Sequence, residues 1–271
     1  MLMIGAVVYI LRAENEALLS TDNGRYMHAA FLRLLERSAP ELTQLLHDEQ
    51  YHKPFSVSGL RACSGSLKSN PQRVMAGELF EWRIAALHEV ILQHALSVQR
   101  GQRIKAGGLQ LTVQEVIADG EQNPRSGVVD EEMLLSACLS VTRVNEMRFR
   151  FLSPTTFRTG QSDWPWPAPE LIFSSLTAKW EGAGLPGKFD QEFIHEAARI
   201  LVPLDWSGKT RRVRFDRDRW TLCFTGDFSY DASGLDDDQT GALLCLAQFG
   251  VFSGVGRMTT QGLGEVEVTY R

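Results

Sequence analysis

The sequence predicts an α+β protein of two tandem ferredoxin-like domains, each with the βαββαβ order also found in RRM-like folds. The length of 271 residues is enough for two domains with a core each. A content of 44% hydrophobic and 23% charged residues is typical of a globular protein. Strand-like and helix-like segments also follow the same order twice, on either side of a polar, turn-rich stretch at 119–127.

Residues 1–119 are predicted to form the first domain. Its opening strand, at 2–12, is a β-branched run that suits a strand buried on both faces. The first helix follows an N-cap at Asp22 or Asn23, because apolar residues then recur at helical spacing. The other elements are a short helix from Pro40, strands at 55–60 and 78–87, a helix at 88–99 and a strand at 108–117.

Residues 120–138 are predicted to connect the domains, and 139–271 to form the second one. This domain repeats the order of the first, with one inserted helix. Its last helix starts with acidic residues, which suit the positive end of a helix dipole, and Gly250 is predicted to end it. The elements are a strand at 139–151, helices at 169–180 and 191–201, a strand pair at 213–215 and 220–230, a helix at 236–249 and a strand at 263–270.

Composition excludes several classes of protein. The four cysteines form no CxxC pair and have no matching histidine pair, which argues against a zinc finger and a disulfide framework. No apolar run approaches the roughly 18 residues of a membrane span, and the apolar N-terminal stretch lacks the basic start of a signal peptide. We therefore expect a cytoplasmic protein with no membrane partner, no bound metal and no cofactor.

A basic cluster lies in the second half, although the formal net charge is −5. Residues 209–219 hold six basic side chains against two aspartates. Phosphate binding needs only a local patch of this kind, whatever the charge of the whole chain. The alternative is the solvated face of an ordinary hairpin. Further up the chain, Arg148 and Arg150 alternate with Phe149 and Phe151, so the arginines should share one face of a strand.

A glycine-rich loop between the last helix and the last strand reads G-x-G-x5-G-x-G, from Gly254 to Gly264. A dinucleotide fingerprint would need glycine at Thr259 and would follow a strand, and a phosphate-binding P-loop would need GK[ST]. Four glycines do permit positive φ angles and exposed amides that face an anion, with Arg257 nearby. The alternative is a structural turn against a neighbouring helix.

Three segments together resemble a known family. The loop FSGVGRMTTQGLG (252–264) resembles the signature loop of the repeat-associated (RAMP) CRISPR proteins. FLSPTTFRTG (151–160) with LIFSSL (171–176) is similar to the start of the second domain of the CRISPR precursor-RNA processing endoribonucleases, and FTGDFSY (224–230) to the strand before its last helix. The resemblance is good over 140–271 and looser before it.

This resemblance implies a metal-independent endoribonuclease that cuts CRISPR precursor RNA within each repeat. The 2′-hydroxyl would attack the adjacent phosphate and leave 2′,3′-cyclic phosphate and 5′-hydroxyl ends. The chemistry requires a base, a cation for the developing charge and an acid for the leaving oxygen. Repeat RNA is the implied partner, without direct DNA contact. Retention of the product and association with other CRISPR effector subunits are further expectations.

The resemblance also suggests catalytic residues. Family members place a histidine at the end of the first helical region and a lysine shortly before the next strand, here His47 and Lys53. Others place an arginine three residues before a histidine at the start of the first helix, which Arg25 and His28 match. Leu32 stands where some members carry a tyrosine. The alternative readings are surface histidines at helix ends and a strand-edge lysine.

Residues expected to bind RNA combine basic side chains with the glycines of the loop. They are Arg25, Arg158, Lys209, Arg211, Arg212, Arg214, Gly254, Gly256, Arg257, Gly262 and Gly264. The main alternative function is a non-catalytic RAMP RNA-binding subunit of a CRISPR effector complex. Histidines near the first helix favour the nuclease. A ferredoxin-like enzyme for a phosphorylated metabolite is a third hypothesis, which the basic hairpin makes less attractive.

Overall fold

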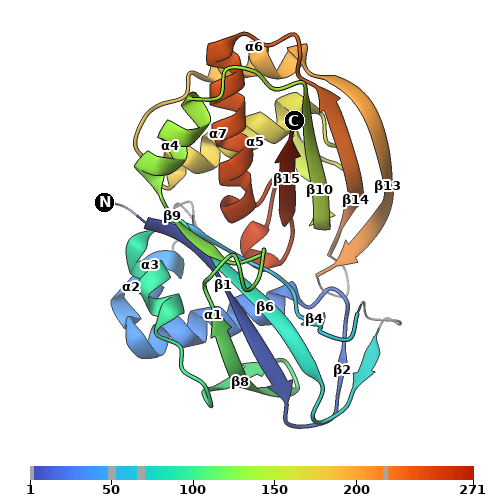
Figure 1. Ribbon diagram of the computed structural model, residues 1–271. Coiled ribbons are helices and arrows are strands. Elements are labelled where there is room, and N and C mark those ends of the chain that lie inside the picture. Colours follow the sequence, from blue (N-terminus) through green and yellow to red (C-terminus); the bar gives the residue numbers. More distant parts are fainter. Residues whose placement is uncertain (1–2, 48–52, 66–70, 216–218) are drawn as a thin grey trace. The chain divides into compact units, whose positions relative to one another are not determined.

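The computed structural model describes residues 3–47, 53–65, 71–215 and 219–271 (Figure 1). The chain divides into two compact units, which we call the N-terminal unit (3–128 with 260–262) and the C-terminal unit (129–259 with 263–271). The division between Val128 and Val129 falls inside the segment expected to connect the domains, 120–138. Each half of that segment therefore belongs to a folded unit.

The N-terminal unit has the predicted βαββαβ order. Its main strands form an antiparallel sheet in the order β3-β6-β1-β8-β7, of which the first four give the arrangement of a ferredoxin-like domain. The principal elements are β1 (Met3–Ala13), α1 (Gly24–Ser38), α2 (Pro40–His47), β3 (Phe55–Val57), β6 (Leu79–Ala86), α3 (Glu89–Leu96) and β8 (Leu109–Ile117). Shorter strands are β2 (Ala17–Leu19), β4 (Arg61–Ala62), β5 (Gln72–Val74), β7 (Arg103–Ala106) and β9 (Gly127–Asp130).

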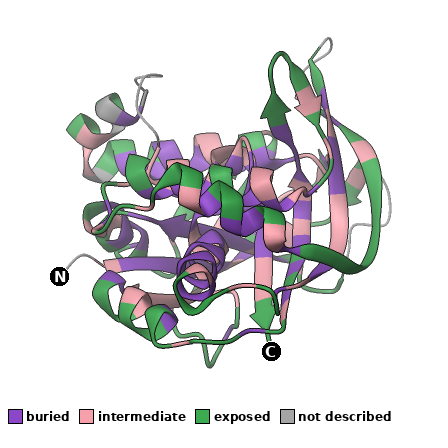
Figure 2. Ribbon diagram, turned by 90° about the horizontal axis from the view of Figure 1, so that it is seen from above, coloured by how far each residue is buried: buried purple, intermediate pink, exposed green. Residues whose placement is uncertain are grey.

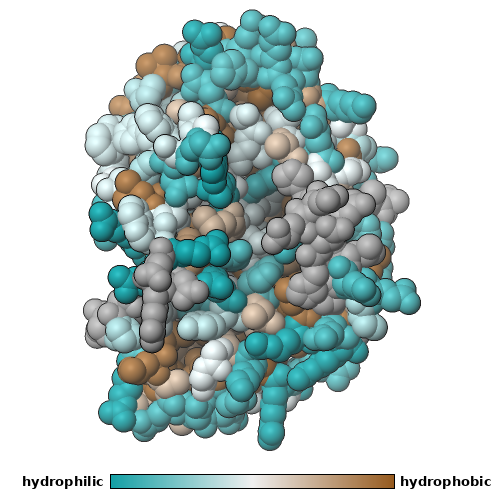
Figure 3. All heavy atoms as spheres, turned by 180° about the vertical axis from the view of Figure 1, so that it is seen from behind, coloured by the Kyte–Doolittle hydropathy of each residue, from teal (hydrophilic) through white to brown (hydrophobic). Residues whose placement is uncertain are grey.

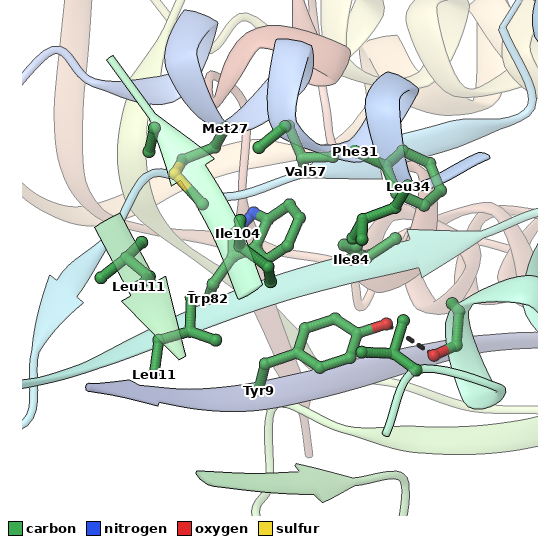
Figure 4. Close-up of a cluster of buried hydrophobic side chains, with 14 of the residues drawn as sticks. Tyr9, Leu11, Met27, Phe31, Leu34, Val57, Trp82, Ile84, Ile104 and Leu111 are labelled. Carbon is green, nitrogen blue, oxygen red and sulfur yellow. Dashed lines mark hydrogen bonds between the residues drawn. The ribbon is translucent and has the colours of Figure 1, made fainter. Parts of the chain in front are cut away.

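The core of this unit lies between one face of the sheet and the helices α1 and α3 (Figure 4). Register places apolar residues of neighbouring strands opposite each other, with Tyr9 beside Trp82 and Leu11 beside Phe80. The Tyr9 hydroxyl donates a hydrogen bond of 2.7 Å to the carbonyl oxygen of Ala95 on α3. A buried phenol needs such a partner, so this bond ties α3 to the sheet.

The polar stretch at 119–127 is fixed to the N-terminal unit. The Arg125 guanidinium lies 2.7 Å from the Glu81 carboxylate on β6, and Arg83 Nε donates to the Arg125 carbonyl oxygen at 2.6 Å. Asp119 and Asn123 close turns within the stretch. These bonds make the segment an ordered part of this unit, although its composition alone suggested a linker.

The C-terminal unit repeats the topology. Its sheet order, β13-β14-β10-β15, is again that of a ferredoxin-like domain and confirms the predicted fold class. The elements are α4 (Glu131–Leu139), β10 (Glu146–Thr155), β11 (Phe157–Thr159), β12 (Ser162–Trp164), α5 (Pro169–Gly182), α6 (Gln191–Ile200), β13 (Val202–Arg214), β14 (Trp220–Asp231), α7 (Asp237–Ser253) and β15 (Val266–Tyr270). A short 3-10 helix, Thr259–Gln261, lies in the glycine-rich loop.

Alternation along β10 separates a core face from a solvent face. Phe149 and Phe151 are buried, and the Phe149 ring meets Phe173 of α5 edge-on at 6.0 Å. Arg148 and Arg150 point to the other face, as predicted from their spacing, and form ion pairs with Asp227 of β14. Most residues of α7 are buried, because α4, α5, α6 and β15 contact it from different sides (Figure 2).

Several element boundaries differ from the prediction. The segment 139–145 is not a strand, because α4 ends at Leu139 and β10 starts only at Glu146. β13 starts at Val202, well before the predicted 213. The sequence did not predict this first part as a strand because residues 202–210 are exposed on both faces and lack the alternation of apolar and polar residues that marks a half-buried strand. Gly250 lies inside α7, which continues to Ser253. A Cβ at Gly250 would come within 3.1 Å of Leu176, so close helix packing explains this glycine.

The surface is mixed in character. In the view from behind, hydrophilic side chains predominate and hydrophobic ones form separate small groups (Figure 3). None of the helices in the described residues combines the length and the apolar character of a transmembrane span. The four cysteines are free thiols.

Candidate active site

The start of α1 carries His28, one of the two histidines predicted to be catalytic. His28 lies one turn into α1, half-buried, and its ring stacks on Phe55 of β3 with centroids 5.9 Å apart and planes 14° from parallel. The side chain of Asn23, just before the helix, accepts a hydrogen bond of 2.7 Å from the Leu60 amide. This bond holds the beginning of α1 to the segment that follows β3. One ring face and the helix backbone thus fix the imidazole.

Lys53 lies beside the same strand. Its carbonyl oxygen accepts a hydrogen bond of 2.8 Å from the Phe55 amide, so Lys53 is two residues from the ring that supports His28. Its side chain is half-exposed. The backbone of Lys53 thus lies next to the strand residue that stacks on His28, and we call these positions, with Arg25 one turn earlier on α1, the α1–β3 corner (Arg25, His28, Lys53 and Phe55).

His47 is the last residue of α2. Its side chain, like residues 48–52 with His52, lies outside what the structure describes. The other first-helix candidates differ in environment: Arg25 is exposed, whereas Leu32 is buried in the core of the unit. Leu32 thus fills a packing position. Among the remaining histidines, His88 caps α3 by accepting from the Val90 amide at 3.2 Å, a structural role.

All four glycines of the loop have positive φ angles, as their spacing predicted. The angles are 67° at Gly254, 77° at Gly256, 87° at Gly262 and 74° at Gly264. Close approach adds a second requirement, because a Cβ at Gly264 would overlap the Val255 carbonyl oxygen. A side chain at either end of the loop would therefore strain the backbone and collide with it.

The amides of this loop serve a different purpose from the one expected. The Gly254 amide donates to Gly250, that of Gly256 to the Ser175 hydroxyl at 2.9 Å, and that of Gly264 to the Pro154 carbonyl at 3.0 Å. The prediction that these glycine amides are exposed toward an anion is therefore wrong for these three positions. Their physical role is to shape the loop and tie it to neighbouring elements.

The tip of the loop groups with the N-terminal unit. Residues 260–262 belong to that unit, where a Cβ on Gly262 would come within 2.7 Å of the Gly24 Cα at the start of α1. A Cβ on Gly24 would in turn overlap the Gln261 carbonyl. Gly24 and Gly262 thus allow the backbone of the loop tip to approach the backbone at the start of α1 within this unit.

Lys179 was not predicted to take part in the site, yet it holds the start of the loop. From α5 its ammonium donates to the carbonyl oxygens of Ser253 at 3.3 Å and Gly254 at 2.9 Å, and to the Thr259 hydroxyl at 3.2 Å. Burial lowers the pKa of Lys179 to about 7. A lysine one turn after Leu176, on the apolar side of a helix, was the available sequence signal.

Arg257 projects from the middle of the loop into an ion pair. Its Nη1 lies 2.6 Å from Asp163 Oδ1 on β12, and the other carboxylate oxygen accepts from the Thr221 hydroxyl on β14. The Arg257 side chain is about one-third exposed. The pair connects the loop to the hairpin formed by β13 and β14.

The predicted basic cluster lies on β13 and divides between its two faces. Lys209 and Arg211 fall on one side and Arg212 and Arg214 on the other, because β13 pairs with β14 without a break over these residues. The Arg212 guanidinium lies 4.5 Å from the centre of the Trp220 ring. On β11, Arg158 is exposed and folds back on its own turn, where it donates to Gly160 and Gln161.

Among the described residues, no group of three or more histidine, cysteine, aspartate or glutamate side chains is arranged to hold a metal ion. The sequence did not predict the role of Lys179. It also did not predict that the C-terminal unit exposes four tryptophans. The spacing of aromatic residues along a sequence does not indicate which of them are exposed, so these tryptophans could be found only from the structure.

Two family models match the chain. Residues 6–126 match the CRISPR Cas6 N-terminal domain, and residues 149–266 match the CRISPR-associated endoribonuclease Cas6. Together they cover both units with their main sheets.

Individual relatives agree. A CRISPR-associated endoribonuclease Cas6 from Mycobacterium tuberculosis is 26% identical over 262 residues, covering 90% of this chain and 71% of the relative. A solved Cas6 product complex superimposes with a TM-score of 0.79 at 26% identity, covering 98% of this chain and all of the other. Cas6 of Thermus thermophilus gives 0.74 at 25% identity over 99% of both chains.

Proposed function

The chain belongs to the Cas6 family of CRISPR-associated endoribonucleases, and on that premise we propose that it cleaves CRISPR precursor RNA within its repeats without a metal ion. Membership of this family supports a role as an endoribonuclease that processes CRISPR precursor RNA. The cleavage chemistry and the residues that perform it are our proposal.

The proposed reaction is an internal transesterification. The 2′-hydroxyl oxygen forms a bond to the adjacent phosphorus while the bond from phosphorus to the 5′-oxygen breaks. A base accepts the proton of the 2′-hydroxyl, and an acid supplies one to the 5′-oxygen. The products are a 2′,3′-cyclic phosphate and a 5′-hydroxyl, so no atom from water is required in this step.

The observation that carries the proposal is the α1–β3 corner. His28 supplies an imidazole, a group that exchanges protons near neutral pH, and Phe55 limits the orientations of its ring. Lys53, two residues from Phe55, supplies a cation for charge that develops on the phosphate oxygens. His47, at the end of α2, is the second proposed proton carrier. Each group is expected to contribute about 10²–10³-fold to the rate.

RNA binding is assigned to basic side chains near this corner and on the C-terminal unit. Arg25 is proposed to contact the substrate beside His28, and Arg158, Lys209, Arg211, Arg212 and Arg214 to contact its phosphates. The loop residues have an indirect role in RNA binding. The glycines set the shape of the loop, because the amides of Gly254, Gly256 and Gly264 donate hydrogen bonds within the protein, and Arg257 holds the loop to Asp163.

Repeat RNA is the proposed partner, and solved structures of Cas6 relatives include a product complex and a substrate-mimic complex. Association with other CRISPR effector subunits and a cytoplasmic location are further parts of the proposal. The competing function is a non-catalytic RNA-binding subunit of the same superfamily, which would bind repeat RNA and leave it intact.

The test is incubation of the purified protein with end-labelled repeat RNA, with and without EDTA. We expect one cut per repeat at an unchanged rate in EDTA. The upstream product should resist 3′-end ligation until its cyclic phosphate is opened and the remaining phosphate is removed. Tight binding without cleavage would support the competing function, and loss of cleavage in EDTA would contradict the metal-free route.

A further inference from the structure

Four of the six tryptophans are unusually exposed. Trp82 and Trp180 are fully buried, whereas Trp164, Trp166, Trp206 and Trp220 keep 40–55% of their surface accessible. All four belong to the C-terminal unit. Exposure of one large aromatic ring is common, but several on neighbouring strands indicate a binding surface.

The rings at one end of this surface are held in place by their neighbours. Trp206, on β13, lies opposite Phe228 of β14, and the two rings are within 6° of parallel at 6.2 Å. Trp166 stands nearly perpendicular to both, at 5.3 Å from Trp206 and 5.5 Å from Phe228. Aromatic contacts of this kind fix the ring without covering it.

A second aromatic position lies further along the same face. Uninterrupted pairing from Asp205 to Arg214 places Trp206, Gly208, Thr210 and Arg212 on one side of β13. Arg212 lies over the Trp220 ring at 4.5 Å. Six residues of strand separate the two positions by about 20 Å. Only Gly208, which has no side chain, and the small side chain of Thr210 lie between them on this side of the strand.

The charge of the strand favours an anionic occupant. β13 carries Lys209, Arg211, Arg212 and Arg214, and Asp205 is its one acidic residue. Exposed aromatic rings interleaved with basic side chains are how proteins bind unpaired nucleic acid, because every base has a face that can stack. Cations on the same strand attract the phosphates between those bases.

The same strand is poorly suited to an added polypeptide strand. β13 is an edge of its sheet, but Pro203 has no amide hydrogen to donate. Lysine and arginine along an edge strand also discourage pairing with another chain. The surface therefore fits RNA better than a second copy of this protein.

We propose that this tryptophan face (Trp166, Trp206, Arg212 and Trp220) binds unpaired bases of an RNA substrate. Bases stack on Trp206 and Trp220, and Arg212 and Arg214, on the same side of β13, contact the phosphates between them. The inference rests on the proposed function for the identity of the polymer. It adds to that function a site for single-stranded RNA beside the repeat segment that is cut.

The experiment measures binding of a labelled uridine homopolymer of about 12 nucleotides, with a blunt-ended RNA duplex as comparison. Trp206→Leu and Trp220→Leu should each weaken homopolymer binding by at least about fivefold and leave duplex binding unchanged. Trp206→Phe keeps an aromatic face and should retain most of the affinity. Trp164→Leu is the matched control, because that residue is exposed equally but lies on β12, outside the face.

Unchanged binding in both leucine variants would overturn the inference, as would an equal loss in the Trp164 control. So would a wild-type dimer that Trp206→Leu dissociates without affecting homopolymer binding, because the face would then be a protein interface. Thermal unfolding of each variant excludes misfolding, and Trp206→Phe provides a second measurement if the leucine variant unfolds. Cleavage of repeat RNA by the wild type is scored separately, so its failure would contradict the proposed function and leave this test intact.

Discussion

The two units share a strand order but differ most in one equivalent strand. In the N-terminal unit, the strand after the first helices is β3, with three buried residues. Its counterpart in the C-terminal unit, β13, has 13 residues and is exposed on both faces from Val202 to Thr210. A short buried strand can brace a side chain from the helix above, as Phe55 braces His28. A long edge strand instead displays its side chains to solvent.

One strand order can therefore support two tasks. We expect the N-terminal unit to control the rate of cleavage and the C-terminal unit to control affinity for RNA. Variants in each unit test this division of roles.

The largest expected effect is on rate. His28→Ala should slow single-turnover cleavage of repeat RNA by about 10²–10³-fold, because the imidazole is a proposed proton carrier, and should leave the dissociation constant nearly unchanged. His47→Ala should behave alike. The control is His195→Ala, an exposed histidine on α6. If both variants cleave at the wild-type rate, the N-terminal unit does not supply the chemistry.

The next effect is on stability of the C-terminal unit. Gly264→Ala should lower the free energy of unfolding by about 3 kcal/mol, because its Cβ would overlap the Val255 carbonyl at a positive φ. Gly160→Ala also has a positive φ but meets nothing within 4 Å, so we expect a loss nearer 1 kcal/mol. Urea unfolding measures both. Equal losses would show that close approach does not constrain the loop.

A smaller effect is expected on RNA affinity. The double change Arg211→Ala with Arg212→Ala should weaken repeat binding about tenfold and reduce its salt dependence, while the rate at saturating protein stays the same. Arg148→Ala with Arg150→Ala removes equal charge from β10, outside the predicted basic cluster, and should matter less. A lower saturated rate in the β13 variant would blur the proposed division between the units.

The smallest effect is a pH dependence at Lys179. Its pKa is about 7 in the folded protein and near 10.4 when unfolded, so the unfolded chain binds more protons between these values. Wild-type stability should therefore rise relative to Lys179→Met above pH 7, by about 1 kcal/mol between pH 7 and 8, and run parallel to it below pH 7. Thermal unfolding at several pH values tests this. A constant difference above pH 7 would mean that the ammonium stays charged.

Sequence reasoning predicted the architecture because hydrophobic patterns repeat in both halves. Phe149 and Phe151 alternate with arginines, and the buried side of β10 follows directly. The prediction failed where contacts with neighbouring helices or strands determine the local structure. Gly250 was predicted to end a helix, yet it allows close contact with Leu176, and α4 lies almost entirely within the range predicted to connect the domains, 120–138.

The sequence predicted which residues form the candidate site, but it did not predict the contacts that those residues make. The family resemblance suggested Arg25 and His28, but the support from Phe55 is a long-range contact that no local pattern contains. The positive φ angles of the loop glycines followed from glycine spacing. The hydrogen bonds that occupy their amides, and Lys179 beneath them, depend on elements distant in sequence.

The pairing of β15 with β10 has a consequence for how the protein is made. β15 completes the C-terminal sheet by pairing Val266 with Phe151 and Tyr270 with Met147. The strands of the N-terminal sheet, by contrast, all end by residue 130, so they are synthesised long before β15. During translation the second sheet must wait for its last strand, with one side of β10 open to other chains. A truncation before Val266 should therefore yield a nascent protein prone to aggregate.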